Sequence, residues 1–110
     1  MPFVEVKRRG MDDSVYITQY HIMISYSLIK KHFDENKKIL VFIDREGKKV
    51  GFKPSETKGY KITKTNNGSR RIYCMPLTKH VRGRFYPSWD NKLGMLILSY
   101  EDKDLVNRNL

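Results

Sequence analysis

Two stretches of this chain follow the same pattern, and that pattern decides the fold. The first is HIMISYSLIKKHF (21–33) followed by KKILVFIDREGKKVGFKP (37–54). The second is RRIYCMPLTKHV (70–81) followed by RFYPSWDNKLGMLILS (84–99). Each reads as a strand rich in β-branched residues, then a short helix, then two strands joined by a polar turn.

The two stretches also align residue by residue. Ile24 aligns with Ile72, which brings both helices into register, and residues 41–52 align with residues 87–98 without a gap. The sequence therefore predicts one strand–helix–hairpin unit written twice, about 16–54 and about 70–99. The alternative is two ordinary hairpins that match by coincidence.

Local patterns predict the elements and the class. Helices are expected at 27–33, behind Ser27 as N-cap, and at 76–81, with Pro76 in the first turn. The turn at 44–47 leaves Gly47 free to take positive φ. Strands are expected at 3–7, 15–18, 21–25, 39–44, 50–53, 60–63, 71–74, 84–87 and 95–99. The chain is thus predicted to be β-rich α+β.

A single core should hold the apolar residues of both units. Interleaving the units pairs their edge strands and closes a small β-barrel, which removes exposed strand edges. The expected core residues are Ile24, Ile29, Phe33, Leu40, Phe42, Val50, Phe52, Ile72, Leu77, Val81, Trp89, Leu96 and Leu98. One chain can complete this barrel alone, so a monomer or weak homodimer is expected.

Length and composition set limits on the kind of protein. The chain has 110 residues, of which 39% are hydrophobic, which fits one domain over 1–110 with residues 101–110 as a tail. The longest apolar run, 39–43, is far below the ~20 residues of a membrane span. The N-terminal residues have no apolar stretch typical of a signal peptide. We therefore expect a cytoplasmic protein that does not enter a membrane.

The charge is strongly positive and concentrated. The formal net charge is +10, and no acidic residue occurs from Thr57 to Trp89. Eight cations fall in that stretch: Lys58, Lys61, Lys64, Arg70, Arg71, Lys79, Arg82 and Arg84. Because solvated surfaces usually mix both signs of charge, this stretch indicates a phosphate-bearing partner. The alternative is a solvated, lysine-rich face.

The repeated unit resembles the SpoVT/AbrB swapped-hairpin domain, a family of small DNA-binding regulators and antitoxins. The resemblance is carried by HIMISYSLIKKHF, by the acidic–basic hairpin that follows it, and by Lys53-Pro54 at the hairpin's end. It implies a swapped-hairpin-like barrel. Tandem copies in one chain are similar to the MraZ-like proteins. It also implies transcriptional regulation through binding of duplex DNA.

We expect duplex DNA to be contacted by a basic face. The candidate residues are Lys30, Lys31, Arg70, Arg71, Lys79, Arg82 and Arg84, with an arm of Lys7, Arg8 and Arg9. The seven tyrosines leave open a second ligand, single-stranded nucleic acid or RNA, bound by aromatic stacking. A third possibility is a viral or plasmid protein that uses its basic face against an acidic protein.

No catalytic or metal-binding pattern occurs in the sequence. The one cysteine, Cys74, has no recognisable His–Asp partner, and His21, His32 and His80 are not spaced as zinc ligands. The carboxylates lie scattered in turns and tails, without a phosphate-binding glycine loop. We therefore expect no enzyme activity, no catalytic residues and no cofactor.

Overall fold

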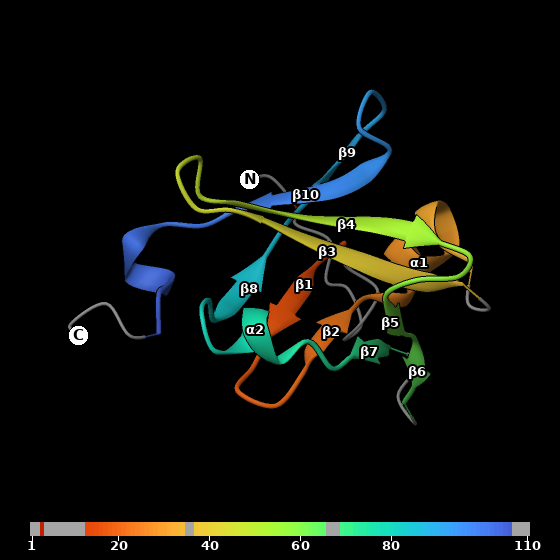
Figure 1. Cartoon of the computed structure of the whole chain (residues 1–110), viewed down its shortest axis with the longest axis horizontal. Helices are drawn as coiled ribbons and strands as arrows, with labels where there is room; N and C mark the ends of the chain where they lie inside the picture. The colour runs from red at the N-terminus through yellow and green to blue at the C-terminus, as the bar shows by residue number, and fades with distance from the viewer. Residues whose placement is uncertain (1–2, 4–12, 35–36, 66–68, 107–110) are drawn as a thin grey trace.

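The chain folds into two five-stranded antiparallel sheets (Figure 1). The computed structural model describes residues 3, 13–34, 37–65 and 69–106. Sheet A has the order β6 (Thr63–Lys64), β7 (Arg70–Ile72), β2 (Ile22–Ile24), β1 (Val15–Ile17), β8 (Gly83–Phe85). Sheet B has the order β5 (Tyr60–Lys61), β3 (Lys38–Asp44), β4 (Lys49–Ser55), β10 (Met95–Ser99), β9 (Ser88–Asp90). The predicted β-rich α+β class is confirmed.

The helices are short and lie close to the predicted positions, but the first begins after Ser25, so the prediction of Ser27 as its N-cap was wrong. Helix α1 (Tyr26–His32) buries Leu28 and Ile29, and the single turn of α2 (Met75–Thr78) buries Leu77. A 3-10 turn, η1 (Asp102–Asp104), follows β10.

Part of the predicted C-terminal tail is bonded to the body of the protein. The Arg82 amide donates to the Asp104 carbonyl at 2.9 Å, and the Val106 amide donates to the His80 carbonyl at 3.0 Å. Residues 101–106 therefore pack beside α2 and β8. At the other end, Phe3 lies outside any strand, and the remainder of the predicted strand 3–7 falls outside the described residues.

Each sheet is centred on one antiparallel pair of strands, one strand from each aligned stretch. In sheet A, Met23 of β2 pairs with Arg71 of β7. The residue before Met23 pairs with the residue after Arg71, and the residue after Met23 pairs with the residue before Arg71. In sheet B, Gly51 of β4 pairs with Ile97 of β10, again with crosswise pairing on both sides. Aligned positions thus face each other across both centres, in a two-fold pattern.

One apolar core lies between the inner faces of the two sheets. Ten of the thirteen expected core residues are buried: Ile24, Ile29, Phe33, Val50, Phe52, Ile72, Leu77, Val81, Leu96 and Leu98. Leu40 and Trp89 are partly buried. Phe42 was wrongly placed in the core, since its side chain is 46% exposed. The inner face of β3 is formed by the alternate residues Ile39, Val41 and Ile43.

The predicted barrel closure does not occur, because neither sheet closes on itself in the part of the chain that the structure describes. At both edges the chain passes from one sheet to the other through a short connection. Buried Ile62 joins β5 to β6, and residues 86–87 join β8 to β9. Pro87 has no amide hydrogen to donate to a ladder, so the bend at this corner interrupts the strand.

The two hairpins of sheet B have closely similar turns. Asp44 Oδ1 accepts a hydrogen bond from the Gly47 amide, and Asp90 Oδ1 accepts from the amides of residues 92 and 93. The prediction that Gly47 takes positive φ was wrong. The left-handed residue is Lys48, with φ 54°, which aligns with Gly94 at φ 66°. The first turn therefore places a side chain where the second has glycine.

A histidine lies at the end of α1 and another just after α2, and each contacts an aromatic residue in or next to sheet B. The ring of His32, the last residue of α1, stacks on Trp89 of β9 with centroids 4.5 Å apart. His80, just after α2, is hydrogen-bonded to the Tyr100 hydroxyl at 3.2 Å. Burial, with the nearby Lys31 charge, lowers the pKa of His32 against a smaller opposing effect of Asp13. Burial and the Arg45 charge lower the pKa of His80.

These two contacts predict a loss of stability in mild acid. A lowered pKa means that the fold prefers the neutral imidazole, so the unfolded chain binds more protons once the pH falls below 6.5. The contribution of the two neutral histidines to the free energy of unfolding is complete above pH 6.5. It is lost as the pH falls from 6.5 through their lowered pKa values. Urea unfolding at about pH 7.5 and about pH 5.5 should show this decrease. A His32→Gln, His80→Gln variant should show a smaller decrease, and an equal decrease would contradict the assignment.

The two phenylalanines of the β3–β4 hairpin provide a matched test of the inner and outer faces. Phe52 is fully buried, so Phe52→Ala should lower the free energy of unfolding by about 3–5 kcal/mol. Phe42→Ala should change it by no more than about 1 kcal/mol, because the side chain is half exposed. Urea denaturation of both variants measures the difference. Equal losses would show that β3 is in the opposite register.

Candidate nucleic-acid interface

A row of side chains crosses the outer face of sheet A from edge to edge. The strand register places five residues at the same level, in the order Arg84, Tyr16, Met23, Arg71, Thr63. We call these five residues the outer row. Their sequence neighbours in β1, β2 and β7 are buried, since successive strand residues point to opposite faces. The outer row therefore lies on the solvent side of the sheet.

Arg84 is held flat against the sheet. Its guanidinium carbon lies 4.8 Å from the ring centroid of Tyr16, and its Nη1 donates to Ser14 Oγ at 3.2 Å. A guanidinium stacked on an aromatic ring is already oriented, so it loses less side-chain entropy when it binds an anion. Tyr16 remains 37% exposed beneath it.

Arg71 is at the other side of the row, in a small aromatic cluster. Its Nη1 donates to the Tyr73 hydroxyl at 3.4 Å, and the His21 ring meets the Tyr73 ring edge to face. Burial and the Arg71 charge lower the pKa of His21. The cation at this position in the row near neutral pH is therefore Arg71, with His21 neutral beside it.

The spacing of the two arginines is set by the sheet. They are three strand steps apart, or about 14 Å, because neighbouring strands lie about 4.8 Å apart. The major groove of B-DNA is about 12 Å wide. Five strands span about 19 Å, which is wider than that groove. The spacing of the two arginines is close to the width of the groove.

Arg70 lies on the inner side of the sheet. It is only 8% exposed, its guanidinium lies 4.8 Å from the Tyr26 ring centroid, and it donates to the Ser69 carbonyl at 3.2 Å. Arg70 and Arg71 are adjacent in β7, so they cannot both point outward. Of this predicted pair, the structure places only Arg71 on the outer row.

The other predicted cations lie beside the helices. Arg82 is half-buried and donates from Nε to the Thr78 carbonyl at the end of α2, while Lys79 is exposed. Lys30 and Lys31 are exposed on α1, where Lys31 forms an ion pair with Asp13 at 2.9 Å. The predicted arm of Lys7, Arg8 and Arg9 lies outside the described residues.

All seven tyrosines were candidates for aromatic stacking, and no sequence pattern was used to single out the two on this surface. Tyr16 lies between the buried residues Val15 and Ile17, and that alternation alone would have placed it on the outer face. Tyr73, which is 53% exposed, follows β7 and carries no such signal. The combination of cations with exposed rings depends on the register between strands.

The described residues contain no candidate metal site. Residues 13–34, 37–65 and 69–106 contain no group of three histidine, cysteine or acidic residues placed to hold a metal ion. Cys74 is buried, and its hydrogen bond with Tyr60, together with burial, raises the pKa of that tyrosine. The helices in the described part of the chain are all too short to cross a membrane.

The geometry can also be compared with known proteins. No protein-family model matches this chain, and no curated protein or solved structure matches it.

Proposed function

We propose that this protein binds duplex DNA with little sequence preference, through the outer face of sheet A. The observation that carries the proposal is the outer row, in which Arg71 and Arg84 lie on one face about 14 Å apart. Arginines spaced in this way suit the phosphates on either side of a major groove. Contacts of this kind are to the backbone and carry no base information.

Charge and resemblance support the same function. A net charge of +10 attracts a polyanion at long range, and the release of counterions from the phosphates favours binding. The resemblance to the SpoVT/AbrB domain adds a role in transcriptional regulation, and a cytoplasmic location is part of the same proposal.

A second candidate ligand is single-stranded nucleic acid. It is favoured by one observation, the exposed rings of Tyr16 and Tyr73 beside the arginines of the same face. Unpaired bases stack on such rings, whereas bases in a duplex are already stacked. RNA would be recognised in the same way.

Removing the two arginines tests the interface. The Arg71→Ala, Arg84→Ala variant should bind every duplex sequence more weakly, and to a similar degree. The slope of log affinity against log salt should fall by up to about 2, since each lost phosphate contact removes about 0.9. Fluorescence anisotropy across a salt series measures both quantities.

A matched control removes the same charge elsewhere. Lys92→Ala, Lys103→Ala alters two exposed lysines outside sheet A, in the β9–β10 turn and in η1. If the control lowers the slope as much as the arginine variant does, binding depends on overall charge and the outer row is not the interface.

Tyr73→Leu separates the two candidate ligands. If the ligand is duplex DNA, the affinity should change less than about twofold, because the ring makes no base contact. Loss of base stacking would instead weaken single-strand or RNA binding by roughly 1–3 kcal/mol. Titrating duplex DNA, single-stranded DNA and RNA with both proteins measures the effect. A large loss on single strands would favour the second candidate.

A further inference from the structure

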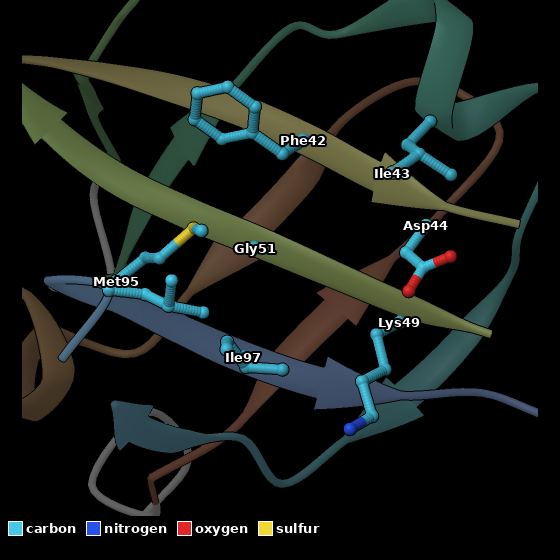
Figure 2. A pocket seen from close by; sticks show the side chains of 8 residues that line it. Phe42, Ile43, Asp44, Lys49, Gly51, Met95 and Ile97 are labelled. Carbon is cyan, nitrogen blue, oxygen red and sulfur yellow. The ribbon is translucent and has the colours of Figure 1, made fainter. Parts of the chain in front are cut away.

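The outer face of sheet B contains an apolar groove. The register places Phe42 of β3, Gly51 of β4 and Ile97 of β10 at one level, pointing away from the core. Figure 2 shows Gly51 between the Phe42 side chain and the side chains of Met95 and Ile97. The groove encloses about 170 Å³ and is also lined by Leu93.

The glycine at the centre shapes this groove. A Cβ at position 51 would lie 2.5 Å from the Met95 Sδ, so only glycine lets Met95 lie across β4 as it does. Phe42 and Leu93, on opposite sides, are 46% and 50% exposed. Apolar side chains gathered around a depression are characteristic of a binding surface, whereas single exposed ones are common on any protein.

The rim of the groove carries two lysines and two aspartates. Lys49 and Lys53 flank Gly51 on the outer side of β4, and both are exposed. Asp44 pairs with Lys49 and also lines the groove, and Asp90 pairs with Met95. In their hairpin turns the Asp44 carboxylate accepts one backbone hydrogen bond and the Asp90 carboxylate accepts two, which partly satisfies their charge. The two lysines are therefore the charges best placed to meet a ligand.

We propose that this groove binds an acidic amphipathic segment of a partner protein. Large apolar side chains of the segment fill the space between Phe42 and Ile97, and its carboxylates meet Lys49 and Lys53. Buried apolar anchors inside a charged rim are the usual composition of a specific interface. An amphipathic helix laid into an apolar groove is a common form of such a segment.

Charge complementarity decides between this partner and the other possible occupants. A second copy of the chain would bring another basic face, from a molecule of charge +10, against the same lysines. Nucleic acid would place phosphates over the apolar centre, where Phe42, Met95 and Ile97 have no strong hydrogen-bond donor to offer.

The groove is separate from the outer row. Both sheets contribute their inner faces to one core, so their outer faces point away from each other. The protein can thus hold nucleic acid on sheet A and a partner on sheet B at the same time. The proposal does not depend on what sheet A binds.

A library of random displayed peptides, selected on the full chain, tests the proposal. Enriched peptides should carry an excess of Asp and Glu together with large apolar residues. Synthetic copies should bind about tenfold or more weakly to a Phe42→Ser, Leu93→Ser variant, as measured by fluorescence anisotropy. Met75→Ser, which alters an exposed apolar residue of α2, is the matched control and should bind normally.

Several results would overturn the proposal. They are an absence of enriched peptides, enrichment without acidic excess, or equal binding to the groove variant. A light-scattering mass of twice the chain mass that Phe42→Ser, Leu93→Ser reduces to that of one chain would identify a second copy as the occupant. Circular dichroism and duplex binding of both variants should stay unchanged, which separates loss of the groove from loss of fold or of nucleic-acid binding.

Discussion

Each hairpin in this protein depends on a strand from elsewhere in the chain to complete its sheet. An isolated two-stranded hairpin is marginally stable in water, because one of its faces must be buried against something else. Here β2 pairs with β7 and β4 pairs with β10, so the centre of each sheet joins segments that are far apart in sequence. The same pairings bring both inner faces onto one core. The fold therefore depends on two long-range antiparallel pairs, and neither aligned stretch can form it alone.

This constraint also determines which side chains reach solvent. Once the inner face of a strand is fixed by burial, its alternate residues must point outward. In β7 the rule turns Arg71 outward and places Arg70 over the Tyr26 ring. In β3 it exposes Phe42 between Val41 and Ile43, which pack on the core. The two candidate binding surfaces thus follow from the register that buries the core.

Much of this arrangement could be predicted from the sequence, and the rest depends on long-range pairing. β-Branched runs located most of the strands, and four-residue apolar spacings located both helices. Phe42 and Ile43 are both large and apolar, so local sequence could not decide which of them faces the core. The positive φ of Lys48 follows from the four-residue turn that joins β3 to β4, where composition favoured Gly47. The outer row could not be predicted, since its five residues come from five strands, β1, β2, β6, β7 and β8, and meet only in the folded sheet.

The two aligned stretches keep the same inner face and differ on the outer one. On the inner side, Ile24 and Ile72 occupy equivalent positions, and both are buried. On the outer side of sheet A, Met23 is opposite Arg71, so one stretch supplies the charge. On sheet B the aligned outer residues are Lys49 and Met95, so one stretch supplies rim charge and the other the apolar wall of the groove. Burial restricts the inner positions to apolar side chains, whereas solvent leaves the outer positions unrestricted. A two-fold core can therefore carry two different outer surfaces, one basic and aromatic, the other apolar with charged residues at its rim.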